Sequence, residues 1–415
     1  MNKTKSFNIT KDMVFMAYKA VKANRGGAGV DNVSIQVFEL HLKDNLYKLW
    51  NRLASGTYFP PAVKAVEIPK MSGGTRTLGI PTIADRVAQT VVKKSFEEKV
   101  EPFFIEDSYG YRPNKSAHMA IEVTRKRCWK YNWILEFDIK GLFDNIDHEL
   151  LMKAVKKHTT TNWELLYIQR WLKCAIQKPN GEVVSRDSGV PQGGVISPVL
   201  SNLFMHYAFD KWMEKQFNKN PICRYADDGI VHCYTRVQAE QIKEALKQRF
   251  EQCGLELHPT KTKIVYCKDS NRKEPEEHIQ FTFLGYTFKP RKAKGQNGQE
   301  FTSFLPAISQ DAQKRIRQEI RNWKLLKLYH IKIEEIAQQY NSKIRGWLNY
   351  YGRFGRKVLS DVLKHINFHL VLWIKRKYKK YKRRTMRSRE LLRKIAMQNK
   401  ELFEHWKVGI LPATG

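Results

Sequence analysis

The sequence CRYADDGIVHC at residues 223–233 places two adjacent acids and a glycine between two short runs of strand-forming residues. Asp-Asp-Gly between such runs predicts the tight turn of a β-hairpin, because aspartate and glycine adopt turn conformations readily. A structural turn is sufficient to explain the pattern. The alternative is that Asp227 and Asp228 stand together at the hairpin tip for a chemical purpose.

A third acid occupies a similar place, because Asp138 ends the apolar run WILEF, which predicts a buried strand over 133–139. Neighbouring carboxylates repel one another unless a cation neutralises them. Two divalent ions about 4 Å apart, bridged by carboxylates, catalyse in-line phosphoryl transfer. Oxygen ligands favour Mg²⁺, with Mn²⁺ as a substitute. The three acids are therefore candidates for a site that binds two metal ions.

The charge of the 415-residue chain predicts a polyanionic partner. Its formal net charge is +33, of which +19 falls in residues 311–415 and +14 in the rest. The extreme segment is KRKYKKYKRR at 375–384, with eight basic residues and two tyrosines. Nucleic acid is the first candidate for the partner, and an anionic membrane surface is the weaker one. No membrane span is expected, since the longest uncharged stretch, 188–209, is polar and broken by prolines.

The cysteines and the N-terminus indicate a reducing compartment. The six cysteines show no C-x-x-C spacing, which argues against zinc ribbons and knuckles. The opening MNKTKSFNITKDMVF lacks the apolar core of a signal peptide. We therefore expect reduced thiols and a cytoplasmic protein.

Hydrophobic periodicity predicts a mixed first part and a helical second part. Helices are expected at 84–100, at 235–253 with Gly254 as the C-cap, and at 333–351. The polar, glycine-containing segment 291–300 is typical of a hairpin tip or a linker. Strands and helices alternate up to about residue 300, and helices dominate after it.

Several segments together resemble one protein family. Tyr225-Ala226-Asp227-Asp228 resembles the Y-x-D-D box of reverse transcriptases, and FDIKGLFDNI at 137–146 and GVPQGGVISPVLSNLF at 189–204 resemble two boxes that precede it in the same order. Further segments are similar to group II intron-encoded reverse transcriptases, the maturases. They lie at 26–34, 68–86, 108–121, 258–267, 281–288 and 344–354.

The resemblance implies an α/β right-hand polymerase fold with an antiparallel palm sheet and a helical thumb. It implies an N-terminal extension and fingers at 1–130 and a palm at 131–300. A thumb, or maturase-specific domain, is expected at 301–370 and a basic DNA-binding segment at 371–415. No cysteine follows Cys267, so the H-N-H endonuclease that many relatives carry is not expected. A mobile-intron enzyme of this kind would prime from an existing 3′ end.

For the chemistry, the resemblance implies that Asp138, Asp227 and Asp228 bind the metal ions, together with the backbone carbonyl of Ile139. It makes Lys261 a candidate proton donor to the leaving pyrophosphate. The neighbouring Lys263 is an alternative for that role.

For the incoming dNTP, the resemblance implies that Lys70 and Arg76 contact the triphosphate and that Gln192 lies near the nucleotide. The alternative is that the two cations are solvated on a hairpin and that Gln192 belongs to a structural turn. Phe143 is the expected barrier against a 2′-hydroxyl, which would select dNTPs over rNTPs. An ordinary core phenylalanine is the competing interpretation.

For template and primer, the resemblance implies contacts at Gly193, Gly194 and Tyr225. A larger set of basic side chains is predicted to bind nucleic acid, with a solvated charged helix as the alternative. These are Lys375, Arg376, Lys379, Lys380, Arg383 and Arg384.

The predicted function is an RNA-directed DNA polymerase that copies group II intron RNA and, as a maturase, assists its splicing and mobility. The expected partners are intron RNA, primer, target DNA and dNTPs, in a bacterial ribonucleoprotein in the cytoplasm. Two alternatives stay open. One is a splicing-only RNA-binding maturase, and the other is a domesticated reverse transcriptase of a retron-like or antiviral defence system.

Overall fold

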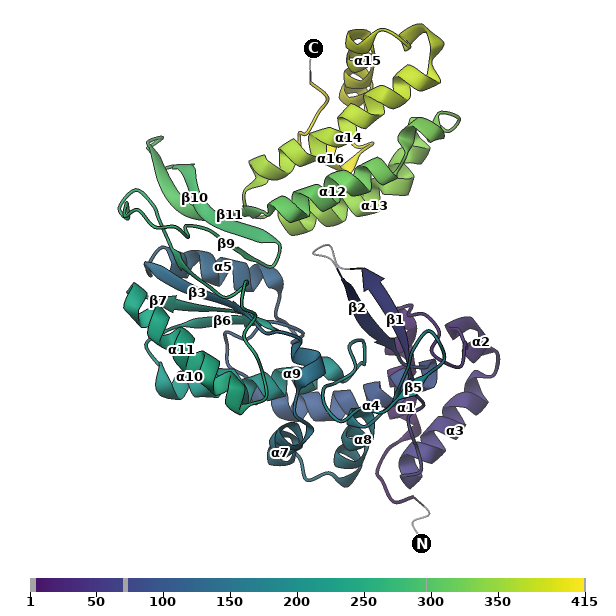
Figure 1. The fold of residues 1–415 in the computed structure, drawn as a ribbon. Helices are drawn as coiled ribbons and strands as arrows, with labels where there is room; N and C mark the ends of the chain where they lie inside the picture. Colours follow the sequence, from purple (N-terminus) through teal and green to yellow (C-terminus); the bar gives the residue numbers. More distant parts are fainter. Residues whose placement is uncertain (1–4, 70–73, 296, 414–415) are drawn as a thin grey trace. The chain divides into compact units, whose positions relative to one another are not determined.

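The computed structural model describes residues 5–69, 74–295 and 297–413, and it divides into two compact units. The first unit holds residues 1–120 and 135–264, and the second holds 121–134 and 265–415. Figure 1 labels most of the helices and strands of both.

The first unit begins with helices that surround a small sheet. Strand β1 (Val63–Pro69) pairs antiparallel with β2 (Thr75–Ile80) and parallel with β4 (Ile176–Gln177), which pairs with β5 (Val183–Val184). The long helix α4 (Ile83–Val100) confirms the helix predicted at 84–100, and the Thr82 hydroxyl caps its first turn. The other helices of this part are α1 (Lys11–Ala23), α2 (Ile35–Leu40), α3 (Leu42–Ser55) and η1 (Glu101–Phe103).

A second sheet carries the predicted acids. Its strand order is β6-β7-β3-β8, with β6 (Ile222–Tyr225), β7 (Asp228–Cys233), β3 (Trp133–Asp138) and β8 (Lys263–Tyr266). The predicted strand at 133–139 and the predicted hairpin at 223–233 are both confirmed. Phe137 of β3 packs against Phe209 and Phe250, with ring centroids 4.9 and 5.9 Å away, so helices close one face of the sheet.

Those covering helices include α11 (Arg236–Gln252), which confirms the helix predicted at 235–253. The predicted C-cap is off by one residue: Cys253 is the C-cap of α11, and Gly254 after it has the left-handed φ of +71° that favours glycine beyond a helix end. The remaining helices of the first unit are α6 (Leu142–Asn145), α7 (His148–His158), α8 (Asn162–Leu172), α9 (Ser197–Met205), the π-helix η2 (His206–Asp210) and α10 (Lys211–Gln216).

The second unit contains a three-stranded sheet and a helical bundle. The sheet order is β11-β10-β9, with β9 (Phe281–Phe283), β10 (Tyr286–Lys294) and β11 (Glu300–Ile308). The β10–β11 turn falls within 291–300, as the sequence predicts. The helices are α12 (Gln310–Asn322), η3 (Leu325–Leu328), α13 (Ile333–Tyr351), α14 (Arg356–Lys377), η4 (Lys379–Tyr381), α15 (Thr385–Gln398) and α16 (Glu404–Lys407). Most of α5 (Ala117–Cys128) also belongs to this unit.

The bundle shares one hydrophobic core from α12 to α16. Helix α13 matches the prediction at 333–351, and it buries the expected stripe that includes Ile336 and Ile344. Leu392, Phe403 and Trp406 lie in the same core. The predicted boundary between 370 and 371 therefore falls within α14, and the segment after it packs onto helices α12, α13 and α14.

Among the described helices, none combines the length and the apolar character needed to cross a bilayer. All six cysteines fall within the described residues, where each is buried and none is joined to another by a disulfide.

Candidate active site

The strand register brings the three predicted acids together. Tyr225 pairs with Asp228, so Ala226 and Asp227 form a two-residue turn at the tip of the β6–β7 hairpin. Asp138 ends β3, the strand beside β7 in the sheet. The Asp138 carboxyl group is close enough to Asp228 to raise its pKa.

Burial and mutual repulsion shape the protonation of this cluster. Burial, reinforced by the charges of Asp227 and Asp138, raises the pKa of Asp228 to about 7. Burial also raises the pKa of Asp227, and Asp138 acts in the same direction. Carboxyl groups perturbed by burial and by like charge are typical of functional sites, where a bound cation would reverse the repulsion.

Lys261 supplies one positive charge to the cluster. Its ammonium group donates to Asp138 Oδ2 at 2.6 Å, and its side chain stays 59% exposed. Backbone pairing holds the two segments together, because His258 N donates to Asp138 O at 2.8 Å and Ile139 bridges Leu257. Lys263, the alternative proton donor, is the first residue of β8 and is exposed.

The carboxyl groups of Asp138, Asp227 and Asp228 are suitable ligands for a divalent ion that prefers oxygen. Their present positions do not form a complete metal site. Across residues 5–69, 74–295 and 297–413, no three His, Cys, Asp or Glu side chains meet the geometry of a metal site. Asp138 has one oxygen engaged by Lys261. Carboxylate oxygens are nonetheless the ligands that Mg²⁺ prefers. A metal ion at Asp138 would bind through Oδ1 or displace the Lys261 ammonium from Oδ2.

The turn itself holds an uncommon backbone conformation. Ala226 has φ +58°, at a position of two-residue hairpins that favours glycine. Left-handed backbone costs a residue with a Cβ roughly 1–2 kcal/mol. The surrounding contacts must therefore hold the turn in place.

Two residues predicted to face the nucleotide, Arg76 and Gln192, lie in contact. Arg76 Nε donates to Gln192 Oε1 at 2.6 Å, and Gln192 Nε2 donates to Asp144 Oδ2 at 3.2 Å. Gly79 N of β2 donates to the Gln192 carbonyl at 2.6 Å, which joins the strand to the loop. Arg76, Gln192 and Asp144 line a cavity of about 550 Å³. Lys70, the other predicted triphosphate contact, lies outside the described residues.

Of the two glycines predicted to contact template or primer, Gly193 is required by the chain's own packing, whereas Gly194 is near a side chain that can move. Gly193 has φ +106°, and a Cβ there would lie 2.4 Å from the Gly79 carbonyl oxygen. A Cβ on Gly194 would lie 2.6 Å from Ser197 Oγ. Contacts within the chain are enough to explain the glycine at 193. The contact of Gly193 and Gly194 with template or primer therefore stays a prediction.

Gln89 is an anchor of this loop that the sequence interpretation did not single out. Its Oε1 accepts from Val195 N at 2.7 Å and from Ile196 N at 3.3 Å. Its Nε2 donates at 2.9 Å to Asp85, a fully buried acid. The sequence does contain a signal for Gln89. It lies four residues after Asp85 in a valine-rich helix, and buried polar side chains need hydrogen-bond partners.

Phe143 and Tyr225 occupy different environments. Phe143 is 9% exposed on α6, and its carbonyl accepts from Val190 N at 2.7 Å. This burial is compatible with a core role and with a wall at the edge of a site. The Tyr225 ring lies 6.3 Å from that of Tyr111, a second tyrosine whose pKa is raised by burial and by Asp227. Tyr111 was not predicted as a site residue.

The basic run at 375–384 is not a single helix. It covers the end of α14, the short η4 and the residues before α15. Lys377 donates to the carbonyls of Tyr329 and Ile331 at 3.2 and 2.6 Å, so it helps to fix the end of α14. The six predicted nucleic-acid contacts are exposed, except that Lys375 is half-buried.

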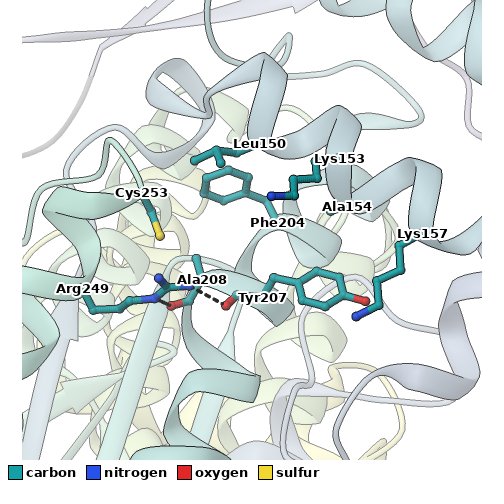
Figure 2. A pocket seen from close by; sticks show the side chains of 9 residues that line it. All are labelled: Leu150, Lys153, Ala154, Lys157, Phe204, Tyr207, Ala208, Arg249 and Cys253. Atoms are coloured by element: carbon teal, nitrogen blue, oxygen red, sulfur yellow. Dashed lines mark hydrogen bonds between the residues drawn. The ribbon is translucent and has the colours of Figure 1, made fainter.

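An apolar pocket of about 300 Å³ lies elsewhere in the first unit, between α7, α9, η2 and α11 (Figure 2). Phe204, Tyr207 and Cys253 line it, and none of the predicted site residues does. At its edge Arg249 donates to the carbonyls of Tyr207 and Ala208, both at 3.0 Å. The pocket is therefore separate from the acid cluster.

Two protein-family models match successive parts of the chain. Residues 68–288 match the model described as reverse transcriptase (RNA-dependent DNA polymerase). Residues 313–391 match the maturase-specific domain of group II introns. The first match spans more than half of the chain and includes every predicted catalytic residue.

The chain is also similar to individual proteins and to a solved structure. Protein YkfC of Escherichia coli K12 is 30% identical over 304 residues, which cover 64% of this chain and 77% of that protein. Group II intron-encoded protein LtrA of Lactococcus lactis is 33% identical over 196 residues, 47% of this chain and 32% of LtrA. A solved telomerase from Candida albicans aligns with a TM-score of 0.47 at 12% identity, over 91% of this chain and 68% of that one.

The family matches confirm the predicted fold class, a right-hand polymerase with a helical C-terminal region, and the predicted polymerase activity. The chain belongs to the reverse transcriptase family of RNA-dependent DNA polymerases and carries the maturase-specific domain of group II intron proteins.

Proposed function

We propose that this chain copies group II intron RNA into cDNA by two-metal nucleotidyl transfer and, as a maturase, assists splicing and mobility of that intron. The observation that carries the catalytic part is the convergence of Asp138, Asp227 and Asp228, whose crowding and burial raise the pKa of Asp228 to about 7. Such crowding is favourable only when a cation shares the site.

In this mechanism the three carboxylates, with the Ile139 carbonyl, would hold Mg²⁺, for which Mn²⁺ could substitute. When bound, the ions lower the pKa of the primer 3′-hydroxyl and stabilise charge on the leaving pyrophosphate. The side chains Arg76 and Gln192, already in contact at 2.6 Å, orient the incoming dNTP. Lys70 adds a second cation for the triphosphate.

Lys261 has two successive tasks in this scheme. Its ammonium group neutralises Asp138 before substrate binds, at a donor–acceptor distance of 2.6 Å. When the acids bind ions, the ammonium is released from Asp138 and can donate a proton to the pyrophosphate oxygen. A half-exposed lysine on a flexible stem has the reach for both positions.

The maturase part is a binding function. The match over 313–391 and the net charge of +19 in residues 311–415 support contacts with folded intron RNA. Phosphate contacts from basic surfaces of this region would stabilise the folded RNA over unfolded forms. Primer and target DNA are the further partners, within a bacterial cytoplasmic ribonucleoprotein.

The test separates the two activities. Asp227→Asn removes a proposed metal ligand and no phosphate contact, so primer extension in Mg²⁺ should be lost while RNA affinity stays within a few-fold. Intron splicing assisted by this variant should persist. Asp361→Asn, which alters an exposed acid on α14 paired with Lys364, is the matched control and should extend primers normally. Wild-type extension by Asp227→Asn would refute the two-metal assignment.

A further inference from the structure

A fully buried arginine lies directly beneath the catalytic turn. Arg224 is the third residue of β6, two positions before Ala226, the left-handed residue of the turn, and its side chain has no exposed surface. All five of its N–H donors have partners. Nε and Nη2 donate to the two carboxyl oxygens of Asp210 at 2.8 and 2.6 Å. The remaining N–H groups donate to Asn202 Oδ1 and the Ala226 carbonyl at 3.1 Å each, and to Ser108 Oγ at 2.9 Å.

The acceptor of the paired bonds, Asp210, is also fully buried and lies at the end of the π-helix η2. A π-turn inserts an extra residue into a helix, so it changes the direction of the side chains that follow, and such turns are frequent at functional sites. Arg249 donates to the carbonyls of Tyr207 and Ala208 within this π-turn, as Figure 2 shows. Arg249 thus fixes the backbone of the π-helix that carries Asp210, in addition to the bonds that Asp210 accepts from Arg224.

The turn also contacts a second segment of the chain. A Cβ on Gly110 would lie 2.5 Å from Ala226 N, so the backbone at Gly110 packs directly on the turn. Asn202, which also accepts from Arg224, donates to the Gly110 carbonyl at 2.7 Å. The hydrogen-bonded network of Arg224 and Asn202 therefore contacts the turn through a bond to the Ala226 carbonyl and also fixes Gly110, which packs on Ala226 N.

We propose that the Arg224–Asp210 pair is a positioning unit for catalysis, which holds the Ala226 carbonyl and thereby the left-handed turn that presents Asp227 and Asp228. Arg224 touches no reacting atom in this scheme and acts through the backbone. The inference rests on the proposed metal-binding role of the two acids. It predicts that loosening the guanidinium weakens ion binding and turnover more than substrate binding.

The test uses Arg224→Lys, which keeps the charge but loses the planar fork, and Asp210→Asn, which keeps the shape but loses the charge. Mn²⁺ binding to the full chain, followed by electron paramagnetic resonance, should weaken about tenfold in both, as for other residues that orient metal ligands. Turnover on a primed RNA template should fall on the order of 100-fold, as for a small misplacement of reacting groups, with the KM for dNTP changed less than about threefold.

Glu164→Gln is the matched control for general loss of stability. Glu164 is equally buried and is paired with Lys99 at 2.8 Å, and none of its hydrogen-bond partners lies in the catalytic turn. The variant should lower the melting temperature without changing Mn²⁺ affinity or turnover of the folded protein. If Arg224→Lys does not fold, Asp210→Asn decides the question by the same measurements.

A double variant tests the route through the backbone. Glycine adopts positive φ without a Cβ penalty, so Ala226→Gly should restore part of the Mn²⁺ affinity lost in Arg224→Lys. An absence of any restoration would contradict that route. Folded Arg224→Lys or Asp210→Asn protein with unchanged Mn²⁺ affinity and turnover would overturn the inference as a whole. The proposed function would fail separately, by normal primer extension in Asp227→Asn.

Discussion

Lowering the pH should weaken divalent-ion binding, because a proton and the ion compete for Asp228. Burial and the charges of Asp227 and Asp138 raise the pKa of Asp228 to about 7 in the absence of metal. With that pKa, roughly nine-tenths of the carboxyl groups are ionised at pH 8 and roughly one-tenth at pH 6. Apparent Mg²⁺ affinity should therefore fall about tenfold from pH 8 to pH 6.

Titration calorimetry at pH 6 and pH 8, in buffers of different ionisation enthalpy, measures both the affinity and the protons released. About 0.9 proton per site should leave Asp228 on binding at pH 6 and about 0.1 at pH 8. Asp228→Asn should bind more weakly and lose this pH dependence. Equal affinity and equal proton release at the two pH values in the wild-type chain would refute the reasoning.

Three further changes test other parts of the site. Phe143→Ala should raise rNTP use relative to dNTP use in primer extension, whereas an unchanged ratio with a lower melting temperature means a core role. Gly193→Ala should lower the melting temperature and extension together, because its Cβ would meet the Gly79 carbonyl at 2.4 Å, and normal values for both would contradict that packing. A quadruple alanine variant of the basic run should reduce the slope of log K against log salt for duplex binding by on the order of two to three, and an unchanged slope means a merely solvated surface. The changed residues are Lys379, Lys380, Arg383 and Arg384.

The sequence predicts those parts of the fold whose signals are local. The helix at 333–351 is indicated by the spacing of its apolar residues Ile336, Tyr340 and Ile344, and the structure forms it over the same residues. The hairpin at 223–233 is likewise set by a turn signal between apolar runs. Each of these elements needs only its own residues to be recognised.

Features that depend on contacts across the chain were not predicted. Gln89 and the loop it anchors are more than 100 residues apart in sequence, so neither segment alone indicates the bond. The basic run has the charge of a solvated helix, but Tyr378 ends α14 and the run continues as a short turn and loop. Tertiary packing, rather than local propensity, decides such details.

The buried pair of Arg224 and Asp210 illustrates why a charge inside an apolar strand is informative. Replacing a buried ion pair with apolar side chains is often neutral or stabilising, so stability alone is a weak reason for a chain to contain one. Here all five guanidinium donors have acceptors, and one of those bonds goes to the carbonyl of Ala226 in the turn that carries Asp227 and Asp228. An apolar side chain could fill the same space but could not hold that carbonyl. Our proposal that Arg224 and Asp210 position Asp227 and Asp228 therefore gives a reason for the buried ion pair that core packing alone does not.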